Sequence, residues 1–144
     1  MKKCAKVICV WFGDKRPGNS NVNTIEIIDD MIDNEMTIDT GYPTDTIWVI
    51  NKCGNELWDN YLDRYNGKST LNGKMIVEKR KNSALAFGAY LHAYKKYKKD
   101  YDYFWFCEDD VFLYRDNYVK EYVDYIEDHP FVSFLGIAPI VDDA

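Results

Sequence analysis

The sequence contains few of the residues that build metal clusters or disulfide frameworks. Two histidines occur among 144 residues, and the four cysteines stand apart without a CxxC spacing. This distribution argues against a zinc site and against a disulfide-stabilised fold, and it predicts reduced core thiols. No apolar run approaches the roughly 20 residues needed to cross a bilayer, so we expect no membrane span. Met1 is followed almost at once by a strand pattern rather than a leader, which predicts a cytoplasmic location.

A long basic face is also missing. The formal net charge is -6, so a nucleic-acid partner is not expected. The hydrophobic share of 47% is enough for a sizeable core in a chain of this length. We find no internal repeat, low-complexity tract or linker, and therefore predict a single domain over residues 1–144.

A run of aromatic residues followed by three carboxylates is the most distinctive stretch of the chain. Residues 103–107 show no polar alternation, which predicts a fully buried strand. Glu108, Asp109 and Asp110 follow directly. Such neighbouring carboxylates repel each other, and Mg²⁺ or Mn²⁺ commonly compensates by binding one or two of them together with substrate phosphates. The pattern favours a metal–diphosphate site, with a solvated acidic turn as the structural alternative.

The rest of the chain alternates between apolar runs and amphipathic helices. Ile25, Ile28, Ile32 and Met36 recur on one helical face, and Ser83 is placed to cap the longest helix. This alternation predicts an α/β fold, a Rossmann-like α/β/α sandwich with a mostly parallel sheet. Strands are expected at 6–12, 46–50, 74–77, 103–107 and 131–140, and helices at 24–36, 56–65, 83–99 and 117–128.

The expected topology places a ligand crevice at one edge of the sheet. In doubly wound sheets the chain adds strands to one side of the first strand and then returns to its other side, and ligands bind at that switch point. The strand at 103–107 would be the one that returns. The ends of the first and fourth strands would then meet, with the end of the second strand and residues 80–82 along one flank. Cationic and amide groups would face an acidic cluster, which suits a nucleoside diphosphate.

Four short pieces, in this order, carry a resemblance to a known family. They are Val10-Trp11-Phe12, Trp48-Val49-Ile50-Asn51, Asn82-Ser83-Ala84 and Phe104-Trp105-Phe106-Cys107-Glu108-Asp109-Asp110-Val111. Together they resemble the nucleotide-binding half of a GT-A fold glycosyltransferase of the family-2-like group, over residues 6–115. The last piece is similar to the hydrophobic run and DxD motif of that family.

The resemblance implies a metal-dependent glycosyltransferase with a UDP-sugar donor. It implies Mn²⁺ or Mg²⁺ as cofactor, bound by Asp110 and Glu108. Asp109 would hold the ribose, or the metal through water, and would act with Asp110 in the transfer step. The nucleotide-binding residues that it implies are Phe12, Gly13, Asp14, Asn51, Arg80, Asn82, Glu108 and Asp109.

The sequence departs from the family pattern in three places. The motif begins with Glu108 rather than aspartate, and Asn51-Lys52 stands where the family often has an acidic residue. The part that follows Asp110 is shorter than the family's acceptor-binding half. Asp142 and Asp143 are the only acids after the last expected strand, so Asp143 is the candidate catalytic base. A homo-oligomer or another partner would complete the site for a glycan, protein or small-molecule acceptor.

Other functions remain open at this point. A nucleotidyltransferase of similar architecture expects a glycine-rich loop with a basic residue after the first strand, which residues 13–18 imitate loosely. A nucleotide-sugar-binding module would keep the pocket without transfer activity. A phospho-acceptor receiver domain needs an acidic pair after the first strand, where only Asp14 is present.

Overall fold

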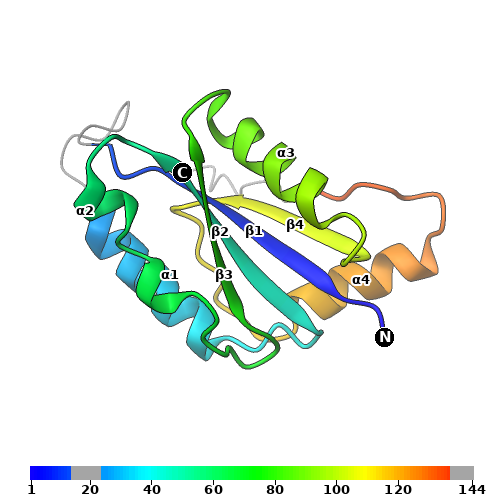
Figure 1. Ribbon diagram of the computed structural model, residues 1–144. Helices are drawn as coiled ribbons and strands as arrows, with labels where there is room; N and C mark the ends of the chain where they lie inside the picture. The colour runs from blue at the N-terminus through cyan, green and yellow to red at the C-terminus, as the bar shows by residue number, and fades with distance from the viewer. Residues whose placement is uncertain (14–23, 137–144) are drawn as a thin grey trace, which may run out of the picture.

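The computed structural model describes residues 1–13 and 24–136 (Figure 1). A four-stranded sheet forms its centre, with helices packed on both faces. In chain order the elements are β1 (Cys4–Val10), α1 (Thr24–Thr37), β2 (Thr44–Lys52), α2 (Glu56–Asp59), the 3₁₀ helix η1 (Asp63–Tyr65), β3 (Met75–Lys81), α3 (Leu85–Tyr97), β4 (Tyr103–Glu108) and α4 (Tyr118–Asp128).

The sheet has the order β3-β2-β1-β4, and all its strands are parallel. The expected α/β class and Rossmann-like arrangement are therefore confirmed. So is the placement of β4 on the other side of β1, which makes the β1–β4 junction the switch point. The register pairs Cys9 with Glu108 and Asn51 with Arg80, so the polar strand ends lie at one edge of the sheet.

The two faces of the sheet are covered by different helices (Figure 1). On one face α3 places Ala89 and Ala93 against alternate residues of β1 and β2, including Val7 and Val49. The opposite face carries α1, and next to it α4. β1 and β2 are consequently buried along almost their whole length, which explains their continuous apolar sequences.

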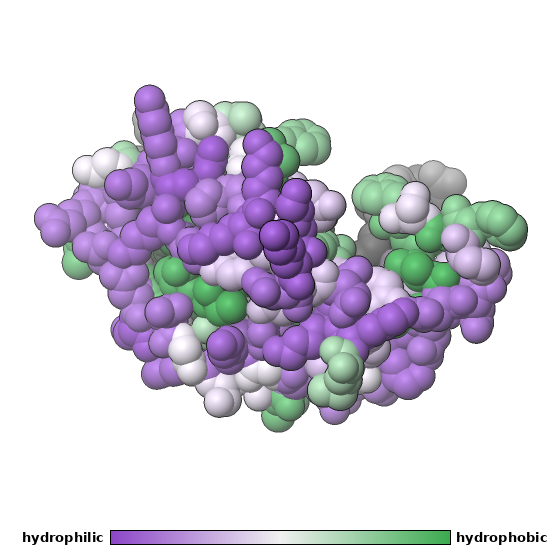
Figure 2. All heavy atoms as spheres, turned by 45° about the vertical axis from the view of Figure 1, so that its right-hand side comes forward, coloured by the Kyte–Doolittle hydropathy of each residue, from purple (hydrophilic) through white to green (hydrophobic). Residues whose placement is uncertain are grey.

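Two strand predictions need correction. β4 was expected to be fully buried, but it pairs only with β1 in the described part of the chain, and Phe106 is 40% exposed. A strand was also expected at 131–140. Residues 131–136 form no strand, and Phe131 and Phe134 are exposed, while 137–140 lie outside the described residues. Aromatic content alone does not distinguish a central strand from an edge strand or a surface segment. Figure 2 shows apolar groups that reach the surface in separate places on a largely hydrophilic face.

Two helix predictions also change. The helix expected at 56–65 is divided into α2 and η1 by turn residues at 60–62. Asp59 ties α2 to the end of β2, because its carboxylate accepts hydrogen bonds from the backbone N–H groups of Cys53 and Gly54. In α1 the predicted inward residue Met36 is 39% exposed, while the neighbouring Glu35 is buried. Glu35 rather than Met36 is buried because its carboxylate forms an ion pair with a charged residue inside the fold.

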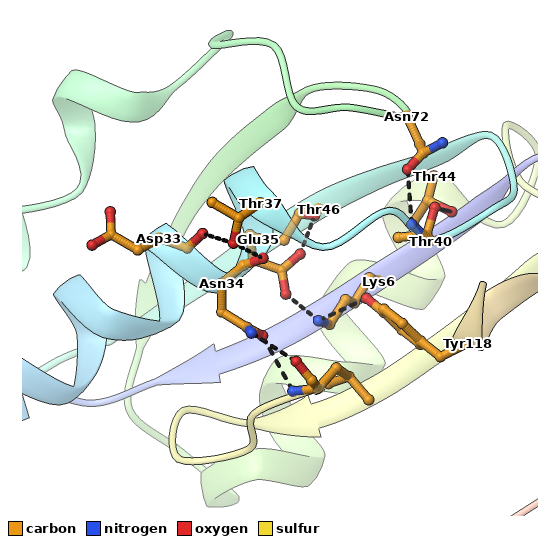
Figure 3. Close-up of polar contacts among 11 residues, drawn as sticks. Lys6, Asp33, Asn34, Glu35, Thr37, Thr40, Thr44, Thr46, Asn72 and Tyr118 are labelled. Atoms are coloured by element: carbon orange, nitrogen blue, oxygen red, sulfur yellow. Dashed lines mark hydrogen bonds and ion pairs between the residues drawn. The ribbon is translucent and has the colours of Figure 1, made fainter. Parts of the chain in front are cut away.

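That partner is Lys6, a fully buried residue at the middle of β1. Its Nζ atom forms an ion pair with Glu35 of α1 and donates a hydrogen bond to the Tyr118 hydroxyl of α4 (3.0 Å). Thr46 of β2 donates to the other oxygen of Glu35 (2.9 Å). Figure 3 shows the four side chains converging from two strands and two helices.

In this pair the buried carboxylate of Glu35 compensates the buried positive charge of Lys6. Burial alone would lower the pKa of Lys6, but the attraction of Glu35 and then of Tyr118 outweighs it, so the pKa of Lys6 is raised and the ammonium stays charged. Removing one partner from such a pair leaves an uncompensated charge in the core, which typically costs about 3–5 kcal/mol.

None of the described helices has the length and apolarity needed to cross a membrane.

We therefore expect Lys6→Met to lower the free energy of unfolding by about 3–5 kcal/mol in urea denaturation, because Glu35 loses its cation. Adding Glu35→Leu to this variant is expected to restore most of the loss. Lys120→Met is the matched control: it breaks an exposed pair with Asp124 one turn along α4 and should change stability by less than about 1 kcal/mol. Equal effects of the two lysine substitutions would contradict a structural role for the buried pair.

Candidate functional site

A pocket of about 260 Å³ opens where the carboxyl ends of the strands meet the start of α3. It lies at the switch point between β1 and β4, where ligands bind in sheets of this kind. Its volume is slightly below the range that usually encloses a whole drug-sized ligand, so it would enclose only part of a larger molecule. The lining residues are Cys9, Trp11, Asn51, Asn82, Leu85, Ala86, Glu108 and Asp109.

Four predicted site residues, Asn51, Asn82, Glu108 and Asp109, line this pocket together. They come from three separate strand ends, which the parallel register brings to one edge. The predicted crevice therefore exists at the predicted place.

Asn51 ties the end of β2 to the neighbouring elements. It is 1% exposed, and its amide nitrogen donates to the Leu85 carbonyl of α3 (3.0 Å) and to the Cys9 sulfur (3.4 Å). Its amide oxygen accepts a hydrogen bond from Nη1 of Arg80 (2.6 Å). With both ends of the amide engaged, Asn51 shapes the pocket wall.

Arg80 in turn organises the link from β3 to α3. Its guanidinium donates to the Ser83 carbonyl and to the Ser83 hydroxyl, both at 3.1 Å. Gly88 leaves room for this arrangement, because a Cβ atom there would lie 2.1 Å from the Ser83 carbonyl oxygen and 2.9 Å from Nη1 of Arg80. Arg80 therefore lies beside the pocket and stabilises the segment that links β3 to α3.

The start of α3 is strained and uncapped. Ser83 was expected to cap this helix, but its hydroxyl accepts from Arg80, and the N-cap residue is Ala84, which has no side-chain cap hydrogen bond. Ala84 and Leu85 both have positive φ values, 56° and 47°. Each such residue costs on the order of 1–3 kcal/mol and persists only where the surrounding structure enforces the conformation. The first N–H groups of α3 thus begin at the pocket without a capping side chain.

Glu108 and Asp109, the first two residues of the acidic turn (residues 108–110), form the other wall. Asp109 is 8% exposed and accepts a hydrogen bond from the backbone N–H of Trp11 (3.1 Å), which joins the ends of β4 and β1. Glu108 and Asp110 are exposed on either side of it in sequence. The turn therefore combines one structural carboxylate with two that face solvent.

Neighbouring groups in this region stay neutral. Burial, followed by the nearby thiols and the carboxylates of Glu108 and Asp109, raises the pKa of Tyr90, so its hydroxyl keeps its proton. Burial also raises the pKa of the Cys107 thiol to about 12, which makes a thiolate at neutral pH unfavourable. The negative charge at the pocket accordingly comes from the acidic turn.

The other predicted residues that the structure describes do not line the pocket. Phe12 is 4% exposed and packs edge-on against Tyr61 in the core, 5.7 Å between ring centroids. Gly13 lies against the Trp11 ring, where a Cβ atom would come within 1.9 Å of that side chain. Asp110 belongs to the acidic turn but not to the pocket wall. Asp14 and Asp143, and most of the loosely glycine-rich loop at 13–18, lie outside the described residues.

Sequence reasoning missed Cys9, Trp11, Leu85 and Ala86 as lining residues. A signal for two of them was present. Successive strand residues point to opposite faces, so Cys9 and Trp11 share the α3 side of β1, while Phe12 points to the α1 side. The two α3 residues depend on where that helix begins, which the expected Ser83 cap had placed too early.

The carboxylates of the acidic turn could hold a hard divalent cation only together with ligands from a substrate or from water. Within residues 1–13 and 24–136 no three histidine, cysteine or acidic side chains are grouped closely enough to hold a metal ion. Mg²⁺ and Mn²⁺ are commonly bound through one or two carboxylates, with phosphate oxygens and water as the other ligands. Glu108 and Asp110 fit that pattern.

Comparison with protein-family models, curated proteins and solved structures finds no match for the chain.

The strain at the start of α3 can be measured. We expect Ala84→Gly to raise the free energy of unfolding by about 0.5–1 kcal/mol, because glycine adopts the positive φ without a steric cost. Ala86→Gly, two residues further along in α3, should lower it by about the same amount, because glycine is unfavourable inside a helix. Urea denaturation measures both, and equal signs would show that position 84 carries no special strain.

Proposed function

We propose that the pocket and the acidic turn form the donor site of a metal-dependent glycosyltransferase that takes a UDP-sugar. The observation that carries the proposal is the shared position of two features. An uncapped helix start and an acidic turn face the same 260 Å³ pocket at the switch point of a parallel sheet. A nucleoside diphosphate needs both an anion site and a cation site within its own length.

The pocket accommodates the nucleoside. Trp11 offers a half-buried aromatic side chain along the wall, which supplies a surface for a planar base. Asn82 lines the same space with an amide that matches the alternating donors and acceptors of a uracil edge. Asn51 and Arg80 keep the wall in shape through the hydrogen bonds described above.

The diphosphate lies between the start of α3 and the acidic turn. The N–H groups of the first turn of α3 supply a partial positive charge on one side. On the other side, Glu108 and Asp110 would hold the cation. A bound Mn²⁺ or Mg²⁺ supplies Lewis-acid stabilisation of the charge that develops on the leaving diphosphate. Asp109 holds the turn against β1 through its bond to Trp11.

We also propose a cellular location and a class of acceptor. The four free cysteines fit a reducing, cytoplasmic location. The acceptor is a glycan, protein or small molecule, and a homo-oligomer or another partner completes its site. The candidate base Asp143 lies outside the described residues.

Calorimetric titration of UDP, with and without Mn²⁺, tests the donor site. We expect Mn²⁺ to strengthen UDP binding to the wild type, and Asp110→Ala to reduce that strengthening by about 10–100-fold, because a cation ligand is lost. Asp100→Ala removes an exposed carboxylate at the far end of α3 and should leave the titration unchanged.

Absence of UDP binding in both conditions would refute the uridine-nucleotide assignment. Binding that ignores both the metal and the Asp110 substitution would keep the nucleotide pocket but remove the acidic turn from its centre. Pyrophosphate release from a nucleoside triphosphate and a sugar phosphate would instead identify a nucleotidyltransferase.

A further inference from the structure

The segment that follows the acidic turn is anchored by a side chain on α1. The amide nitrogen of Asn34 donates to the Leu113 carbonyl (2.7 Å), and the Leu113 N–H donates to the Asn34 amide oxygen (3.2 Å). Figure 3 shows both bonds. One side chain thus satisfies both backbone groups of a residue that belongs to no strand or helix.

More hydrogen bonds hold the same segment further along. We call residues 111–117 the strap. The Asp39 N–H donates to a carboxylate oxygen of Asp116 (2.8 Å), and the Asn117 N–H donates to the Asp39 carbonyl (2.7 Å). At its beginning, Val111 and Phe112 pack against the core that lies under α1. The strap therefore follows the end of α1 and its connection to β2 over its whole length.

The acidic turn is consequently held from two directions. Upstream, Glu108 pairs with Cys9 in the sheet, and Asp109 is bonded to Trp11. Downstream, the Leu113 anchor comes only three residues after Asp110. So few residues between two fixed points leave the turn little conformational freedom.

The helix that carries Asn34 is itself held in place by the buried ion pair. Asn34 precedes Glu35, which is joined to the buried Lys6 and to Thr46. Because these contacts fix the position and rotation of α1, the Asn34 amide is presented in one orientation (Figure 3).

We infer that Asn34 is a positioning residue for the acidic turn, acting on Asp110 through the backbone of Leu113. The inference rests on the proposed function for its consequence, since a correctly placed Asp110 matters for cation binding. Pre-organised ligands of this kind depend on supporting hydrogen bonds from residues that never touch the metal.

The test compares Asn34→Ala with two matched controls. Thr37→Ala removes an exposed hydroxyl of α1 that bonds only within the helix, to the backbone carbonyls of Asp33 (2.8 Å) and Asn34 (3.5 Å). Ile47→Val destabilises the fold by opening space in the core under α3, on the face of the sheet opposite the strap. Calorimetry with UDP and Mn²⁺ is combined with residue-resolved amide hydrogen exchange.

We expect the Mn²⁺-dependent gain in UDP affinity to fall about tenfold in Asn34→Ala, with metal-free affinity unchanged, which is the scale of one or two net hydrogen bonds. The amides of Asp110, Val111 and Leu113 should exchange faster in this variant alone. Both controls should keep the gain, although Ile47→Val is less stable.

Unchanged exchange at Asp110 and Val111 in Asn34→Ala would overturn the inference, as would faster exchange with an unchanged Mn²⁺-dependent gain. If the wild type shows no such gain, the proposed function fails. The exchange rates at Asp110 and Val111 still decide whether Asn34 positions the turn.

Discussion

The buried ion pair between Lys6 and Glu35 is the constraint on which the arrangement of this fold depends. Apolar packing permits many small shifts of a helix over a sheet, but a buried charge tolerates only the geometry that satisfies it. Here one ammonium is shared by α1 and, through Tyr118, by α4, and the carboxylate is shared with β2. Whatever its net contribution to stability, the pair restricts how both helices sit on their face of the sheet.

Fixing the helices matters because the pocket is assembled from segments far apart in sequence. Its walls come from the carboxyl ends of all four strands and from the start of α3. The parallel register brings these ends to one edge, but it leaves the turns beyond them free to vary. Side-chain bonds then settle the turns: Arg80 holds the entry to α3, and Asn34 holds the segment after β4. Polar contacts inside the domain thus determine the shape of the pocket at the carboxyl ends of the strands.

The sequence was sufficient for the fold class, the strand order around β1 and the location of the pocket, because hydrophobic alternation and crossover handedness are local or general rules. It was insufficient wherever a residue's environment depends on the assembled fold. Nothing local marks Lys6 as buried, or selects Glu35 over Met36 as the inward residue of α1. The aromatic residues of β4 predicted a central strand, yet β4 has one partner among the described residues. The predicted Ser83 cap is wrong as well: the Ser83 hydroxyl accepts a hydrogen bond from Arg80, and the N-cap residue of α3 is Ala84.

The strand order also places opposite charges at the two sides of the pocket. β3 ends in the basic sequence Lys79-Arg80-Lys81, and β4 ends in the acidic turn, at opposite sides of the sheet. Three interstrand spacings of about 4.8 Å separate them by roughly 14 Å. An elongated, charged molecule that crosses the strand ends therefore meets positive potential at one end and negative potential at the other. Its two possible orientations differ in energy before any specific contact forms, so the polarity of binding is encoded in the order of the strands.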